Sequence, residues 1–187
     1  MISNKWSKTF NSKPIFLITG NFTKISTFRK KLKNALFFKN KVLVLRIKNS
    51  DVDIDEAFSI SKKFCKKNSI PLILNIQNKF NLKADGYHLQ AKELKKKYFH
   101  TPNMIIGASC HNEEELLAAK KLGCDYIFLS PVVKKNDFRA LGWETFFKLK
   151  NSFPELKIIP LGGVNEKNSM QDSYAGISHW WDLQSPL

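Results

Sequence analysis

Short runs of consecutive apolar residues recur along the chain, and polar or amphipathic segments separate them. Unbroken apolar runs, in place of strict alternation, are typical of parallel strands that are buried on both faces. Several runs end in glycine, serine or asparagine, which favour the turn that must follow a strand. We therefore predict eight parallel strands, at residues 14–20, 42–46, 71–75, 85–89, 104–106, 126–129, 157–161 and 174–178.

The segments between these runs place apolar residues three and four positions apart, as amphipathic helices do. The clearest case follows Asn112, a preferred N-cap residue, and begins with Glu113, Glu114 and Glu115. Carboxylates in a first turn favour the positive end of the helix dipole. We predict helices at residues 26–38, 55–67, 93–98, 113–122 and 143–151.

This alternation of strands and helices favours an α/β fold, a (β/α)8 TIM barrel. The chain has 187 residues, so the barrel must be compact and its helices shortened. An open, doubly wound sheet is the alternative, but no GxGxxG pattern follows the first run. We expect one barrel domain over residues 1–187, in which residues 1–13 form an N-terminal extension.

Candidate anion-binding residues follow the early strands. In a TIM barrel the active site lies at the carboxyl ends of the strands. Arg46 and Lys48 end the second predicted strand, and Asn75 ends the third. Long cations at these positions would point into the mouth of the barrel and could neutralise a pyrophosphate. Solvated strand ends are the alternative.

A second candidate group follows the late strands. Gly162 and Gly163 come after the seventh strand, where backbone N–H groups of barrels often bind phosphate. Ile177 and Ser178, near the eighth strand, could offer further amides. Because tight turns require glycine in any case, a structural role is the alternative for the glycine pair.

Two histidines and their neighbours are candidates for chemistry. Ser109 and His111 lie at the end of the fifth strand. His111 could serve in acid–base chemistry or substrate binding, and helix capping is the alternative role. His88 alternates with buried neighbours, which favours a hydrogen-bonded structural histidine. Lys134 follows Ser130 in a loop that could close over an anionic substrate, and surface solvation is the alternative.

Composition narrows the class of protein. Hydrophobic residues make up 43% of the chain, and no apolar stretch approaches the roughly 18 residues that span a bilayer. The N-terminus lacks the apolar core of a secretion signal, so we expect a cytoplasmic protein. Cys65, Cys110 and Cys124 show no CxxC spacing, which argues against a disulfide framework and a zinc cluster. We expect Cys65 and Cys124 to be buried, whereas Cys110 could be accessible or packed.

The net charge of the protein is +15, and the lysines that contribute to it are spread along nearly every predicted helix. Joint enrichment in lysine and asparagine is what the codon usage of an AT-rich genome would produce without a partner. A pocket for phosphorylated small molecules fits the same charge. No nucleic-acid-binding module is recognisable, so we do not expect nucleic acid as a partner. The sequence leaves the oligomeric state open.

Several of these motifs, taken together, resemble the thiamine phosphate synthase and thiazole tautomerase family. Residues 175–181 resemble the branch of that family that is fused to Nudix hydrolases. The resemblance implies a TIM barrel that joins a pyrimidine pyrophosphate to a thiazole phosphate, with Mg²⁺ and with loss of pyrophosphate. The matching motifs, in order and spacing, are residues 85–89, 107–115, 130–132, 141–143 and 160–164.

The resemblance also implies roles for the residues at the strand ends. Arg46, Lys48 and Asn75 would hold the pyrophosphate end of one substrate, and Ser109 would lie near its pyrimidine. Backbone amides after the late strands would hold the thiazole phosphate. In full, the candidate catalytic residues are His111, Ser109 and Lys134, and the candidate substrate-binding residues are Arg46, Lys48, Asn75, Ser130, Gly162, Gly163, Ile177 and Ser178.

The sequence departs from the family pattern where the metal would bind. The family has Asn-Asp at the third strand and the aspartate binds Mg²⁺, whereas this chain has Asn75-Ile76. The second metal carboxylate aligns with Glu93, in place of the usual aspartate. Because Mg²⁺ demands hard oxygen ligands, we expect weakened Mg²⁺ binding, with Glu93 as the remaining candidate ligand.

Three functions follow from these observations. The first is a thiamine phosphate synthase-like enzyme that releases pyrophosphate. The second is a thiazole tautomerase-like isomerase that relies on His111 and needs no metal. The third is a non-catalytic barrel that retains a phosphate-binding cradle.

Overall fold

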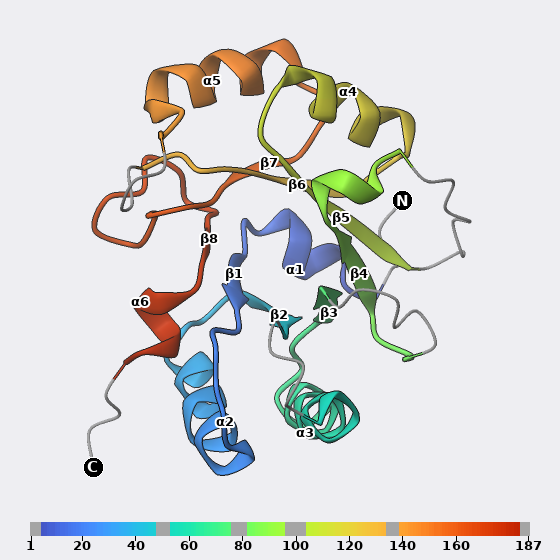
Figure 1. The fold of residues 1–187 in the computed structure, drawn as a ribbon, viewed down its shortest axis with the longest axis vertical. Helices are drawn as coiled ribbons and strands as arrows, with labels where there is room; N and C mark the ends of the chain where they lie inside the picture. Colours follow the sequence, from blue (N-terminus) through green and yellow to red (C-terminus); the bar gives the residue numbers. More distant parts are fainter. Residues whose placement is uncertain (1–4, 48–52, 76–81, 96–103, 134–138, 184–187) are drawn as a thin grey trace.

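The structure is a computed structural model that describes residues 5–47, 53–75, 82–95, 104–133 and 139–183. Eight strands, all paired in parallel, surround the centre of the molecule (Figure 1). Their order is β7-β6-β5-β4-β3-β2-β1-β8, so the ring is closed by hydrogen bonds everywhere except between β7 and β8 within the described residues. The predicted (β/α)8 barrel is confirmed. The strands are β1 (Ile15–Ile18), β2 (Lys41–Arg46), β3 (Leu72–Asn75), β4 (Gly86–Leu89), β5 (Ile105–Cys110), β6 (Tyr126–Leu129), β7 (Ile158–Pro160) and β8 (Ala175–Gly176).

Most of the described helices are short, although α3 has 14 residues, and they lie mostly outside the ring (Figure 1). The prediction of an N-cap at Asn112 is confirmed, because its side-chain oxygen accepts the Glu115 N–H at 2.9 Å. Asp53 caps α3 in the same way through the Glu56 N–H. The helices and 3-10 turns are α1 (Ser7–Asn11), α2 (Ile25–Leu32), η1 (Lys33–Phe37), α3 (Ile54–Lys67), η2 (Ala91–Glu93), α4 (Glu113–Lys121), α5 (Gly142–Ser152) and α6 (Ser178–Trp181).

Three sequence predictions about these elements are wrong in detail. The single helix predicted at residues 26–38 is divided into α2 and η1. The helix predicted at residues 93–98 begins instead as the 3-10 turn η2, and residues 96–98 lie outside the described residues. The last strand ends at Gly176, and Ile177 precedes the short helix α6.

The fifth strand is longer than predicted. The predicted strand ended at residue 106, but β5 runs to Cys110 because its main chain pairs in register with β6, with Ser109 opposite Phe128. Cys110 is therefore buried, so the accessible alternative for it is wrong. Cys65 and Cys124 are buried as predicted.

The strands are buried on both faces, which explains their unbroken apolar runs. Along β1, for example, Phe16 and Ile18 face the barrel interior while Leu17 packs against the outer helices. The interior is rich in aromatic rings, and Phe10 of α1 adds one more, 5.8 Å from the Phe16 ring and 5.9 Å from the Tyr126 ring. Part of the predicted N-terminal extension thus belongs to the barrel core.

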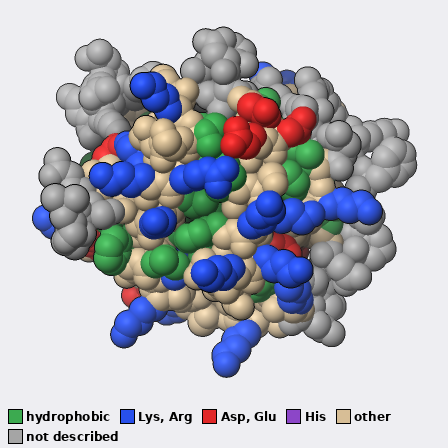
Figure 2. All heavy atoms as spheres, turned by 90° about the horizontal axis from the view of Figure 1, so that it is seen from below, with side chains coloured by type: hydrophobic (Ala, Val, Ile, Leu, Met, Phe, Trp, Pro, Cys, Tyr) green, Lys and Arg blue, Asp and Glu red, His purple; other side chains and the backbone are tan. Residues whose placement is uncertain are grey.

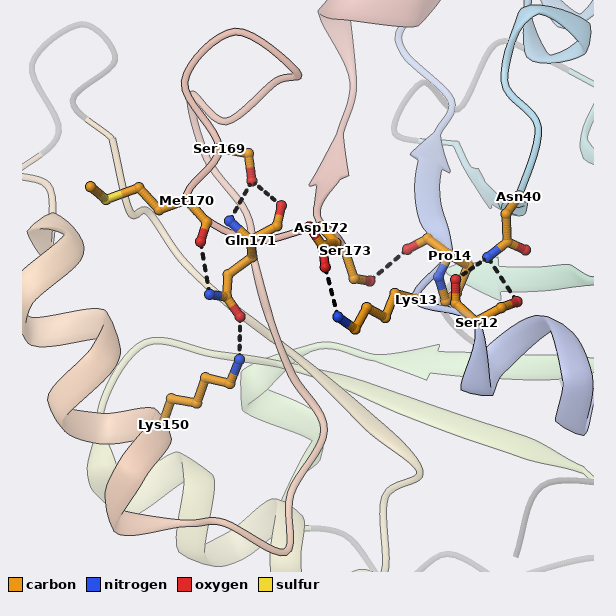
Figure 3. Close-up of polar contacts among 10 residues, drawn as sticks. All are labelled: Ser12, Lys13, Pro14, Asn40, Lys150, Ser169, Met170, Gln171, Asp172 and Ser173. Carbon is orange, nitrogen blue, oxygen red and sulfur yellow. Dashed lines mark hydrogen bonds and ion pairs between the residues drawn. The ribbon is translucent and has the colours of Figure 1, made fainter.

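The long connection between β7 and β8 is tied to the start of β1 (Figure 3). Lys13 forms an ion pair of 2.6 Å with Asp172, and the Ser173 hydroxyl donates to the Pro14 carbonyl at 2.5 Å. On the other side Gln171 accepts a hydrogen bond from Lys150 of α5. The contacts with Lys13 and Pro14 fix the connection beside β1, and the contact between Lys150 and Gln171 ties it to α5, which precedes β7.

The outer surface around α2 and α3 is basic (Figure 2). Lysine and arginine side chains are scattered over this face between apolar patches, and acidic side chains gather at one edge. Leu36 and Phe37 are the exposed apolar residues of η1. None of the described helices is both long and apolar enough to cross a membrane.

Candidate active site

A cavity of about 880 Å³ lies among the carboxyl ends of the strands. It is large enough for a drug-sized ligand, for which pockets of roughly 300–1,000 Å³ are usual. The structure brings to this cavity seven of the residues singled out from the sequence, which come from β2, β3 and β5 and from the segments after β5, β6, β7 and β8. They are Arg46, Asn75, Ser109, His111, Ser130, Gly162 and Ile177.

The other candidates do not line the cavity or lie outside the described residues. Gly163 follows Gly162 but is not part of the lining, and Ser178 is exposed at the start of α6. Glu93 is buried behind the cavity wall. Lys48 and Lys134 are outside the described residues.

The sequence analysis missed the residues that follow β4. Gln90, Ala91 and Lys92 line the cavity, and Lys92 adds a second described cation to that of Arg46. The signal was present, since these residues follow the predicted fourth strand in the way that Lys48 follows the second. The alignment with the metal carboxylate of the family drew attention to Glu93 instead.

Arg46 is held at the end of β2 by its neighbours. The register places it opposite Asn75 on β3, so the two polar side chains end adjacent strands. The Thr19 hydroxyl donates to the Arg46 carbonyl at 2.9 Å and accepts the Arg46 N–H at 2.8 Å, which fixes the main chain. Partial burial lowers the pKa of the Arg46 guanidinium from its usual value, yet arginine stays protonated at any physiological pH. The arrangement offers a fixed, partly desolvated positive charge to an anion.

His111 is oriented by the loop after β6. Its Nδ1 lies 2.7 Å from the Ser130 carbonyl oxygen, which can only accept, so Nδ1 carries the proton in the neutral ring. Nε2 then keeps its lone pair. The His111 N–H also donates to the Glu115 carboxylate at 2.6 Å, so the main chain of His111 takes part in capping α4. The side chain remains available for acid–base or binding work.

His88 lies inside the barrel, as the structural interpretation predicted. Its Nδ1 is 3.1 Å from the Tyr126 hydroxyl, and its Nε2 is 2.8 Å from the Ser109 hydroxyl at the cavity. Burial, and secondarily the charge of Arg46, lower the pKa of His88 to about 3. The ring is therefore neutral at physiological pH.

Gly162 and Gly163 have φ angles of +89° and +68°, which favour glycine. A Cβ at Gly162 would lie 2.7 Å from the Pro131 Cα, so the position also has no room for a side chain. The Val133 N–H donates to the Gly162 carbonyl at 3.0 Å, which binds this turn to the loop after β6. The structural alternative for the glycine pair is thus supported, and phosphate binding by its amides is compatible with it.

The described residues do not form a ligand set for Mg²⁺. The Glu93 carboxylate accepts the Gln90 N–H at 2.8 Å within a capping box and does not reach the cavity lining. The described lining residues include no carboxylate, and the described part of the chain holds no cluster of three histidine, cysteine or acidic residues suited to a metal. Ile76 lies outside the described residues. Mg²⁺ binding stays a prediction.

Eight parallel strands, with a cavity of polar and apolar side chains at their carboxyl ends, define an enzyme of the TIM-barrel class. A family model described as thiamine monophosphate synthase matches residues 15–180, and the chain belongs to this family. The thiamine-phosphate synthase of Vibrio campbellii is 29% identical over 178 residues, which are 89% of this chain and 86% of that protein. The thiamine-phosphate synthase of Caldanaerobacter subterraneus is 30% identical over 146 residues, 71% of this chain and 67% of that protein.

A solved structure agrees with these relatives. The thiamine phosphate pyrophosphorylase from Pyrococcus furiosus superposes with a TM-score of 0.68 at 26% identity, covering 93% of this chain and 90% of that one. The family predicted from the motifs is therefore confirmed. The resemblance to the branch fused to Nudix hydrolases stays a prediction.

Proposed function

We propose that the protein is a thiamine-phosphate synthase that joins a hydroxymethylpyrimidine pyrophosphate to a thiazole phosphate and releases pyrophosphate. The observation that carries the proposal is the meeting of Arg46, Asn75, Ser109 and Gly162 in one cavity, in a chain that belongs to the thiamine monophosphate synthase family.

The reaction begins at the bond between the pyrimidine methylene carbon and the pyrophosphate oxygen. When this C–O bond breaks, the leaving pyrophosphate keeps both electrons and the methylene carbon becomes a cation. Arg46 and Ser109 both line the cavity, and in this proposal the guanidinium and the hydroxyl stabilise the negative charge that grows on the leaving group. The lone pair of the thiazole nitrogen then forms a C–N bond to the cation, and the positive charge passes to the thiazole ring.

The cavity must also keep water away from the cation, because water would capture it. Apolar side chains make up much of the wall, from Ile18, Ile47, Ile54, Phe128, Leu161 and Ile177. They hold the two rings in register and exclude solvent, which favours attack by the bound thiazole.

The proposal is tested with the purified full chain and both precursors. Thiamine phosphate and pyrophosphate should form in equal amounts, and each should require both precursors. Reactions with added Mg²⁺ and with a chelator test the metal prediction separately. A folded protein that forms neither product in either condition refutes the proposal.

The orientation of His111 favours a second candidate function, a thiazole tautomerase-like isomerase. With Nδ1 bonded to the Ser130 carbonyl, the Nε2 lone pair can remove a proton from a bound thiazole phosphate. Incubation with a thiazole phosphate in heavy water separates the two functions. Proton exchange that His111→Ala abolishes, without any thiamine phosphate formation, selects the isomerase.

A further inference from the structure

A chain of three polar side chains crosses the barrel interior and ends at the cavity. The Tyr126 hydroxyl lies 3.1 Å from His88 Nδ1, and His88 Nε2 lies 2.8 Å from the Ser109 hydroxyl. Tyr126 and His88 are buried, while Ser109 lines the cavity. Buried polar groups in an aromatic core are costly unless they are hydrogen-bonded. The bonds within this hydrogen-bonded series of side chains meet that requirement.

The neighbouring strands leave room for the chain. Gly107 stands opposite His88 in the register of β4 and β5. A Cβ at Gly107 would lie 2.1 Å from Cζ of Tyr126 and 2.5 Å from its hydroxyl oxygen. The His88 ring also stacks on Phe128, with 4.4 Å between ring centroids. Gly107 therefore leaves room for the Tyr126 ring, and Phe128 packs against the face of the imidazole.

The imidazole has one donor and one acceptor. Burial and the charge of Arg46 disfavour the protonated ring and lower its pKa to about 3. In a neutral histidine one ring nitrogen carries the proton and the other accepts. The hydrogen bonds that link Tyr126, His88 and Ser109 must therefore all be donated in one of two directions.

The Tyr126 hydroxyl decides between the two directions. Among the described residues, His88 Nδ1 is its hydrogen-bond partner. If Nδ1 carried the proton, the Tyr126 O–H would be left buried without an acceptor, which is unfavourable. If Tyr126 donates to Nδ1, then Nε2–H donates to the Ser109 oxygen, and both buried protons are satisfied. Among the described residues no further side-chain partner of the Ser109 hydroxyl is found, so its O–H can donate into the cavity.

We propose that His88 is a positioning residue that, together with Tyr126, fixes the Ser109 hydroxyl as a hydrogen-bond donor to an anionic oxygen of the substrate. Ser109 and Arg46 both line the cavity, so the two can address the same anion. The proposal rests on the proposed function only for the identity of that anion, the leaving pyrophosphate.

The direction of the chain can be measured without any turnover. The protein has four histidines, His88, His100, His111 and His179, so ¹⁵N-histidine labelling gives a spectrum that single substitutions of the other three can assign. We expect the His88 ring to carry its proton on Nε2 near neutral pH. A ring protonated on Nδ1, or on both nitrogens, overturns the proposal whatever the enzyme catalyses.

Binding of inorganic pyrophosphate, measured by calorimetry, tests the consequence for the ligand. Ser109→Ala removes a hydrogen bond to a charged group and should weaken binding about tenfold or more. His88→Leu should weaken binding as well. When His88→Leu is added to Ser109→Ala, pyrophosphate affinity should fall by less than about a further twofold, because the two residues act as a unit. Losses that multiply in the double variant contradict the proposal.

Tyr126→Phe tests the far end of the chain with little change in shape. It should weaken pyrophosphate binding about threefold and give a mixture of His88 tautomers. Tyr87→Phe is the matched control, because Tyr87 is buried on the outer face of β4 and its hydroxyl donates to the Leu82 carbonyl, away from the cavity. Equal losses in the two variants would show a general packing effect and refute the role of Tyr126. If no thiamine phosphate is formed but the tautomer and binding results hold, the proposed function fails and this inference stands.

Discussion

The two sides of the cavity rim differ in the kind of group that they present. The rim after β2, β3 and β4, here called the cationic arc, presents the polar side chains of Arg46, Asn75 and Lys92. The rim after β5, β6 and β7, here called the scaffolded arc, presents groups whose orientation depends on main-chain contacts. There the Ser130 carbonyl accepts from His111, and the Val133 N–H donates to the Gly162 carbonyl.

The cationic arc therefore supplies charge, whereas the scaffolded arc sets the shape of the cavity. A side chain of the cationic arc can be replaced without disturbing the fold, so its loss should affect binding and rate. A change in the scaffolded arc alters the backbone that shapes the cavity, so stability and function should fall together. Substitutions in the two arcs should therefore be distinguishable by comparing kcat/KM with the free energy of unfolding.

The largest effect is expected in the cationic arc. In the proposed reaction Arg46 stabilises the leaving pyrophosphate, so Arg46→Ala should lower kcat/KM about 100-fold or more. The melting temperature should change little. Arg29→Ala, which removes an arginine on the outer surface paired with Glu56 at 3.3 Å, is the control and should leave kcat/KM unchanged. Similar rates for both variants would contradict the assignment of Arg46.

The scaffolded arc is tested by Gly162→Ala. This change combines a left-handed backbone conformation with a Cβ that would lie 2.7 Å from the Pro131 Cα, and should cost about 2–3 kcal/mol of unfolding free energy. KM for the thiazole phosphate should also rise. Gly142→Ala is matched to it, because Gly142 has φ +77° but nothing within 4 Å of the added Cβ, and should cost only about 1 kcal/mol. Equal costs in urea unfolding would show that the close approach to Pro131 is unimportant.

His88 is buried inside the barrel on β4, next to β5, and should make stability depend on pH. Its pKa is about 3 in the folded protein and about 6.5 when unfolded. The unfolded state therefore binds the proton first, and the stabilisation from the neutral ring is present above pH 6.5. It is lost as the pH falls toward 3, at up to about 1.4 kcal/mol per pH unit. Unfolding titrations of wild type and His88→Leu between pH 7 and pH 4 should differ in slope by this amount, and parallel curves would refute it.

The smallest effect is expected at Thr19, which positions Arg46 through the main chain. Thr19→Val removes the hydroxyl that bonds both the Arg46 N–H and its carbonyl, and should lower kcat/KM about fivefold. Thr19→Ser keeps the hydroxyl and should restore most of the rate. A serine variant as impaired as the valine variant would point to packing of the methyl group instead.

The barrel could be predicted from the sequence because each strand is buried on both faces. The run Phe16–Ile18 contributes to the interior and to the outer layer in turn, which produces an unbroken apolar signal. The ends of the strands and helices were harder to predict. β5 continues through Gly107 and Ser109 because β6 pairs with it, and such long-range pairing has no local signal.

The cavity was predicted only in part. Arg46, Ser109 and Gly162 follow directly from the rule that sites lie at the carboxyl ends of strands. Lys92 was missed because the segment after β4 read as a helix. The Tyr126 hydroxyl was missed because a tyrosine in an apolar run reads as core, and its partner His88 is distant in the sequence.

A crystal structure with bound pyrophosphate tests the central claim most directly, namely that distant strand ends converge on one anion-binding cavity. The account predicts pyrophosphate oxygens within about 3.2 Å of both the Arg46 guanidinium and the Ser109 hydroxyl. Pyrophosphate bound instead on the lysine-rich face of α2 and α3, with the cavity free of it, would contradict the account.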